Sequence, residues 1–102
     1  MAKVIKRRIS WTASDSPDVV KYRVYWEAAP NIPSYSSPHV EVTKNELIIP
    51  DEVPDFPTQE GDYVIGVSAV DDVGNESDIS TVTAPFDFTA PNAPENVSVE
   101  SI

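Results

Sequence analysis

Apolar and polar residues alternate along several short segments of the chain, and the longest such segment covers residues 61–70. Residues two apart on a strand point to the same side of a sheet. The segment GDYVIGVSAV would therefore have two faces, one with Tyr63, Ile65, Val67 and Ala69 and the other with Val64, Gly66, Ser68 and Val70. The residues that follow, DDVGNES, have the composition of a turn. The pattern thus predicts a long strand that ends abruptly.

Shorter segments with the same alternation predict further strands. They are RRISWTAS at 7–14, KYRVYWE at 21–27, HVEVT at 39–43, ELIIP at 46–50 and DISTVTA at 78–84. The 10 prolines lie between positions 17 and 94, where they interrupt most windows that a helix would need. Short strands at this spacing predict an all-β fold, namely an antiparallel β-sandwich in which each sheet buries one face.

Length and composition fit this prediction. A chain of 102 residues, 40% of them hydrophobic, corresponds to one domain with a substantial core. The chain contains no cysteine, which excludes a disulfide framework, a thiolate metal site and a cysteine nucleophile. The absence of cysteine fits a secreted bacterial protein as well as a cytosolic one, so it leaves the compartment open.

The charge is strongly acidic and unevenly distributed. The net charge is −10, and four of the seven basic residues lie at positions 3, 6, 7 and 8, so residues 9–102 carry 3 basic and 17 acidic side chains. A surface of this kind repels phosphate backbones, and we expect no nucleic-acid partner. The basic start is not followed by the apolar run of a secretion signal, and no stretch has the length of a membrane helix. We therefore expect no membrane insertion, and any export signal would lie outside this chain.

Three segments resemble the fibronectin type III family. ISW resembles its second strand, KYRVYW its third, and GDYVIGVSAVDDVGNES its sixth strand with the following loop, in the form common among bacterial members. The resemblance implies an immunoglobulin-like β-sandwich of six to seven strands. It also implies that Trp11, Trp26 and Tyr63 are interior anchors, and that the Tyr63 hydroxyl bonds to the backbone of the preceding loop.

The segment before Tyr63 departs from the family pattern. The family places a leucine six residues before this tyrosine, whereas Leu47 lies sixteen residues before it. We therefore expect residues 51–62, DEVPDFPTQEGD, to form an insertion or an altered corner. Either Val53 or Phe56 would take the place of the family's leucine in the core.

The two ends of the chain also depart from the family pattern. The family's first strand is missing ahead of ISW, whereas the C-terminal segment TAPNAPENVSVESI resembles it, with alternating Val97 and Val99. We therefore predict a sandwich over residues 1–88 and a linker with a strand-like segment over residues 89–102. Three placements of this segment are open: it begins a next domain, it folds back onto its own sandwich, or it is donated to the uncovered edge of a neighbouring molecule, which would be self-association.

The sequence gives little indication of catalysis. His39 is the only histidine, it follows a proline, and no Gly-x-Ser-x-Gly motif is present, so we predict no Ser-His-Asp triad. It also lacks partners at the spacing of metal ligands. A small sandwich with a filled core leaves little room for an enclosed cleft. We expect no enzymatic activity and no cofactor.

One loop carries a candidate cation site, formed by Asp71, Asp72, Glu76 and Asp78. Calcium binds several converging oxygen atoms, which a crowd of carboxylates can supply. However, DDVGNESD does not follow the calcium-loop pattern, and Asp and Asn also favour turns because they hydrogen-bond to the local backbone. Turn chemistry is the alternative that we favour.

The outward face of the predicted sheet carries a candidate binding patch, in which Arg23 and Tyr25 would lie near Val64 and Val70. If these residues are uncovered, they would form a modest apolar patch for a partner. Alternatively, Tyr25 covers the bare strand at Gly66, as aromatic side chains often do. The second alternative leaves no patch.

These features lead to one expected function and one alternative. The expected function is a non-catalytic structural spacer or protein-interaction module in a larger surface or secreted protein, of bacterial type. The alternative is a module that binds carbohydrate or protein through the loops at 31–38 and 71–78.

Overall fold

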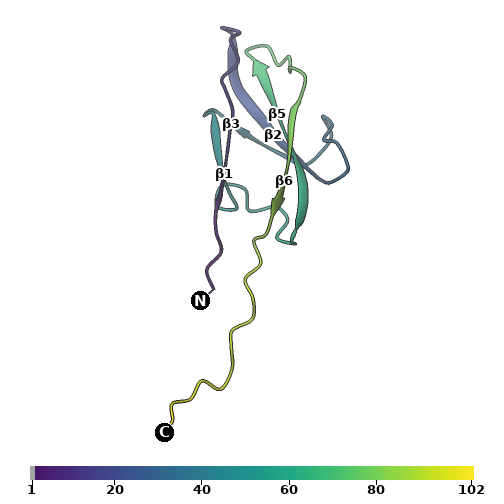
Figure 1. Ribbon diagram of the computed structural model, residues 1–102. Helices are drawn as coiled ribbons and strands as arrows, with labels where there is room; N and C mark the ends of the chain where they lie inside the picture. Colours follow the sequence, from purple (N-terminus) through teal and green to yellow (C-terminus); the bar gives the residue numbers. More distant parts are fainter. Residues whose placement is uncertain (1) are drawn as a thin grey trace.

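The computed structural model describes residues 2–102, which form six strands and no helix (Figure 1). These residues therefore include no helix of the length and apolarity that a bilayer crossing requires. The strands are β1 (Arg7–Ser10), β2 (Val19–Ala28), β3 (His39–Val42), β4 (Glu46–Ile49), β5 (Gly61–Asp71) and β6 (Ser80–Phe86). They lie where the alternating segments predicted them, although β1 ends earlier than its segment and β6 begins and ends later.

The strands form two antiparallel sheets. β1 pairs only with β4, and the larger sheet has the order β3-β2-β5-β6. The prediction of an all-β, antiparallel fold is confirmed, and the two sheets with a shared core are consistent with a β-sandwich. Within residues 2–102, no strand pairs with the other edge of β1.

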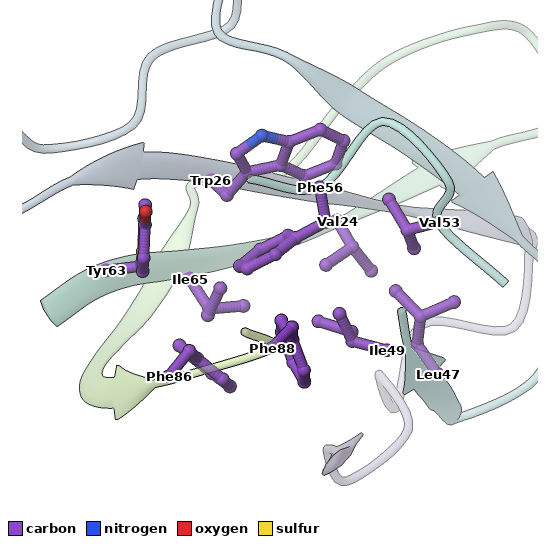
Figure 2. Packing of buried hydrophobic residues seen from close by; sticks show 10 residues of the cluster. All are labelled: Val24, Trp26, Leu47, Ile49, Val53, Phe56, Tyr63, Ile65, Phe86 and Phe88. Atoms are coloured by element: carbon purple, nitrogen blue, oxygen red, sulfur yellow. The ribbon is translucent and has the colours of Figure 1, made fainter. Parts of the chain in front are cut away.

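One apolar cluster lies between the sheets, with Phe56 at its centre (Figure 2). The Phe56 ring centroid lies 5.5 Å from that of Trp26 and 5.3 Å from that of Tyr63, and the rings of Phe86 and Phe88 are also within 5.8 Å. The segment between β4 and β5 therefore contributes the central side chain of the core. The buried members of the cluster are Val24, Trp26, Leu47, Ile49, Val53, Phe56, Tyr63, Ile65, Phe86 and Phe88.

Two of the three expected anchors are fully interior, and the third is not. Trp26 and Tyr63 are buried, and the Tyr63 hydroxyl donates to the Gln59 carbonyl at 2.7 Å, in the preceding loop. Trp11 lies just beyond the end of β1 and is only partly buried. It packs edge-on against Tyr22 with ring centroids 5.6 Å apart. The prediction that Trp11 is an interior strand residue is therefore wrong in part, because no strand covers this edge of the small sheet.

The expectation that each sheet buries a single face is wrong for β5. Val64, Ser68 and Val70 point away from the core cluster, yet each is at most 3% exposed. The loops on either side of this face fold over it, and a Cβ at Gly66 would lie 2.4 Å from Ile79 Cγ2. The centre of the long strand is thus buried on both sides, which a continuous apolar strand requires.

The chain after β6 first returns to the core and then leaves it. Phe88 is 6% exposed and stacks beside Phe86, and the Thr89 hydroxyl donates to the Thr58 carbonyl at 2.7 Å. Residues 91–102 form no strand and are exposed along their whole length. Figure 1 shows them extending away from the sheets, at the end of the molecule where the N-terminal residues also lie.

Candidate functional site

Glu76 is the centre of a hydrogen-bonded network on the outer face of the larger sheet. Its carboxylate accepts hydrogen bonds from the Tyr25 hydroxyl, from Ser68 Oγ at 2.5 Å and from Arg23 Nη1 at 2.7 Å. Arg23 Nε also donates to Glu41 at 2.9 Å, so the network continues onto β3. The Glu76 side chain is only 12% exposed, and its negative charge is balanced by Arg23. The network therefore holds the loop after β5 against the sheet.

The pKa of Glu76 reflects two opposing effects. Burial favours the neutral acid and raises the pKa, but the hydrogen bonds from Ser68, Tyr25 and Arg23 outweigh it and lower the pKa below its ordinary value of 4.5. The pKa of Tyr25 is raised, first by burial and then by its hydrogen bond to Glu76. At neutral pH the carboxylate is ionised and the phenol is protonated, so each group keeps one hydrogen-bonding role.

The four residues of the predicted binding patch lie together, but mostly below the surface. Tyr25, Val64 and Val70 are at most 3% exposed, and the Arg23 side chain is 28% exposed. Tyr25 is paired with Gly66 across β2 and β5. The nearest atoms to a Cβ at Gly66 belong to Ile79 and Pro33, so these side chains, rather than the Tyr25 ring, occupy the space above the glycine.

The four acids of the predicted cation site do not converge. Glu76 points into its network with Arg23 and Tyr25. Asp71 accepts three hydrogen bonds, from the backbone amides of Val73 and Asn75 and from the Asn75 side chain. These contacts outweigh the opposing effect of burial and lower the pKa of Asp71. Asp71 thus makes the turn contacts that the favoured alternative expects, whereas Glu76 bonds to side chains of the sheet.

A different set of acids lies close together. Carboxylate oxygens of Asp18, Asp71 and Asp72 are within 4.8 Å of one another. Asp18 precedes β2, and the sequence pattern gave no reason to place it beside the loop after β5. The Asp72 amide donates to the Asp18 carbonyl at 3.1 Å, so a backbone contact joins the two segments.

His39 is the first residue of β3, and its side chain contacts the loop before this strand. Its Nδ1 lies 3.1 Å from the Ser37 carbonyl, and its ring centroid is 5.0 Å from that of Tyr25. The Ser37 hydroxyl in turn donates to Glu27 at 2.6 Å. These contacts fix the end of the loop against β2.

The loops at 31–38 and 71–78 form one continuous rim. The Tyr35 hydroxyl donates to the Ser77 carbonyl at 3.0 Å, and this bond joins the two loops. Ile32 is 69% exposed, Tyr35 55% and Val73 79%, so large apolar side chains of both loops face solvent. The rim therefore presents three large apolar side chains to solvent.

A groove opens between the uncovered edge of β1 and the start of β6. It has a volume of about 170 Å³. We call it the β1–β6 seam, and its lining residues are Ile9, Ser10, Trp11, Ile65, Val67, Ser80, Thr81 and Val82. Ile65 belongs to the core cluster, and Ile9, Trp11 and Val67 pack against it. The seam is therefore a place where the apolar interior reaches the surface.

A charged group lies at one end of the seam and a polar group at the other. Arg7 spans from β1 to β6 at one end, because its guanidinium lies 4.9 Å from the Phe86 ring centroid and Nη1 donates to the Pro85 carbonyl at 2.8 Å. At the other end, Trp11 Nε1 is the single buried side-chain donor in residues 2–102 that lacks a hydrogen-bond partner. Val82, 57% exposed, marks the opening between them.

Sequence reasoning missed the seam. Its signal is visible only in the structure: β1 has one pairing partner, and Val82 is 57% exposed although it lies opposite Ile65, on the core-facing side of β6. Comparisons with known proteins add no assignment, since no family model matches the chain and no curated protein or solved structure is significantly similar to it.

Proposed function

We propose that the chain is a non-catalytic structural module of fibronectin type III type, and that it interacts with protein by taking up an extended segment in the β1–β6 seam. The module would belong to a larger surface or secreted protein of bacterial type. The support for the fold type is the match of the three resembling segments to β1, β2 and β5, and the Tyr63 bond to the loop before β5.

The seam is the observation that carries the proposed interaction. A strand edge without a partner presents free backbone donors and acceptors, which an added strand can pair. Beside this edge, Val82 and the partly buried Ile9 and Val67 offer apolar contacts for alternate side chains. One extended segment would pair with the free backbone groups of β1 and at the same time cover the apolar groove.

A peptide-binding experiment tests this proposal. The full chain and its Val82→Glu variant would be immobilised and probed with synthetic peptides that alternate valine with acidic residues, and with shuffled versions of the same composition. We expect the alternating peptides to bind the unaltered chain, and Val82→Glu to weaken this binding. Equal binding of shuffled peptides, or no binding at all, would contradict the proposal. Val82 is 57% exposed, so the variant should fold normally.

A second candidate function is supported by the rim of the two loops at 31–38 and 71–78. Its exposed Tyr35 is held in place by the bond to Ser77, and a fixed aromatic ring is a suitable surface for a sugar or a protein side chain. A glycan array probed with the full chain and with Tyr35→Ala tests this candidate. Glycan binding that is lost in the variant would support it, and a blank array would remove carbohydrate as the ligand.

A further inference from the structure

We propose that residues 97–101 of one copy pair as an added antiparallel strand with β1 of a second copy, and that Val97 and Val99 enter the β1–β6 seam. This inference rests on the proposed function, because it names the segment that the seam takes up. The occupant is a second copy of this chain.

The segment has the pattern that the seam requires. Val97 is 87% exposed and Val99 is 97% exposed, so their apolar surface has no cover within the copy that carries them. They alternate with polar residues, and a strand with this pattern can bury its apolar side and leave its polar side exposed to water. Valine is also among the residues that best suit a strand.

The seam indicates a specific register. In the pairing that places Val99 opposite Ile9, Val97 lies opposite Trp11 and Ser98 opposite Ser10. Both valines then lie beside the open part of the seam, beyond the point where Arg7 reaches across to Pro85.

The same register pairs opposite charges on the outer side. Glu100 lies opposite Arg8, whose guanidinium is exposed and lies 3.7 Å from Glu46. More broadly, four of the seven basic residues lie in positions 3–8, next to the edge that would receive the strand, while the rest of each copy is acidic. This complementarity favours contact between the N-terminal part of one copy and the C-terminal segment of another.

The direction of the chain fits donation between copies. The start of β1 and the end of β6 line one groove, with Arg7 near Phe86, while Ile9 lines the seam together with Val82. β1 and β6 therefore run in opposite directions, and the chain leaves β6 along the direction that an antiparallel partner of β1 must have. Figure 1 shows this segment continuing away from the sheets. A second copy placed end to end, in the same orientation, receives it without a reversal of the chain.

Folding back would require such a reversal. Residues 89–96 would have to travel the length of β6 before the segment could run antiparallel to its own β1. Eight residues span roughly 26–29 Å when fully extended, which leaves little slack over a seven-residue strand. Pro91 and Pro94 also restrict the linker, since each fixes its own φ and holds the residue before it in an extended conformation. The contact between copies is head-to-tail, so it builds open chains of molecules.

Engineered cysteines test the donation directly, because the chain has no cysteine of its own. Chains with Ser10→Cys alone would be mixed with tagged chains that carry Ser98→Cys alone, and then oxidised mildly. We expect a disulfide-linked pair of one tagged and one untagged chain, which reductant separates. The matched control is Ser101→Cys in place of Ser98→Cys, since this serine lies three positions out of register and should give much less of the mixed pair.

Each alternative gives a different outcome. A chain with both Ser10→Cys and Ser98→Cys that forms only an internal disulfide, while the single-cysteine chains form no mixed pair, would show folding back and overturn donation. No disulfide in either experiment would show that the segment pairs with neither copy, which also overturns the proposal. Equal cross-linking of Ser98→Cys and Ser101→Cys would overturn the register. If the alternating peptides still bind the seam in these cases, the proposed function stands and only its self-association fails.

Discussion

Arg23 and Glu76 form an ion pair of 2.7 Å on the outer face of the larger sheet, although they lie 53 residues apart in the sequence. The pair joins the middle of β2 to the loop that follows β5. Tyr25 and Ser68 donate to the same carboxylate, so one acid satisfies three donors from two strands. An acidic loop that resembled a cation site in the sequence thus acts as a cover for the sheet.

Replacement of Glu76 by glutamine should lower the free energy of unfolding at pH 7 by about 1.5–3 kcal/mol, the usual contribution of a hydrogen bond to a charged group. The folded-state pKa of Glu76 is below 4.5, so its stabilising contribution is present above that value and is lost as the pH falls through the lowered pKa. The difference in stability between the two proteins should therefore shrink as the pH falls below 4.5. Urea unfolding of both proteins from pH 7 to pH 3 measures this, and a constant difference would contradict it.

Gly66→Ala should lower the stability of the fold because the Ile79 side chain occupies the space that the new methyl group would need. This Cβ would lie 2.4 Å from Ile79 Cγ2, and such overpacking costs about 1–3 kcal/mol. In a background with Ile79→Ala the clash is removed, so Gly66→Ala should cost much less there. A double-mutant cycle by thermal unfolding checks this. The same cost in both backgrounds would mean that Ile79 is not what covers the glycine.

Tyr63→Phe should destabilise the fold by about 1 kcal/mol, because it removes a hydroxyl that donates to the Gln59 carbonyl in a part-buried setting. Tyr35→Phe is the matched control. It removes an equivalent hydroxyl bond that is exposed to water, so its effect on stability should be smaller. Chemical denaturation measures both effects. Equal destabilisation by the two substitutions would contradict the stabilising role given to the Tyr63 hydroxyl bond.

The strands could be read from the sequence because their causes are local. Alternation along residues 61–70 depends only on neighbours in the chain, and the two buried aromatic anchors lie within such segments. The cover on the outer face was not readable in the same way. Ile79, Pro33 and Glu76 reach that face from loops, and their positions depend on contacts between residues far apart in the sequence.

The candidate sites show the same division. A count of acids in DDVGNES could not tell that Glu76 turns inward to Arg23 while Asp71 fixes its own turn. Asp18 joins Asp71 and Asp72 only through the pairing of β2 with β5. The alternation of Val97 and Val99 was visible in the sequence, but the seam that would receive them exists only once β1 is left with one partner.

Phe88 should be as important for stability as residues within strands. It follows β6, yet it is 6% exposed and packs against Phe56 and Phe86, so Phe88→Ala should cost about 3–5 kcal/mol. Val99→Ala is the control in dilute solution, where a 97% exposed side chain should change stability by less than about 0.5 kcal/mol. Phe88→Leu would keep the chain folded if the alanine variant does not fold. A negligible effect of both Phe88 variants would place this residue outside the core.

Donation of the C-terminal strand is tested most directly by amide hydrogen exchange of the full chain, followed residue by residue from dilute to concentrated solution. If the C-terminal segment is donated between copies, residues 97–101 and the amides of β1 that point away from β4 exchange fast when dilute and gain protection together as concentration rises. Exchange that stays fast in both segments at every concentration would contradict it. So would protection that is already complete in dilute solution, because that result belongs to a strand paired within its own copy.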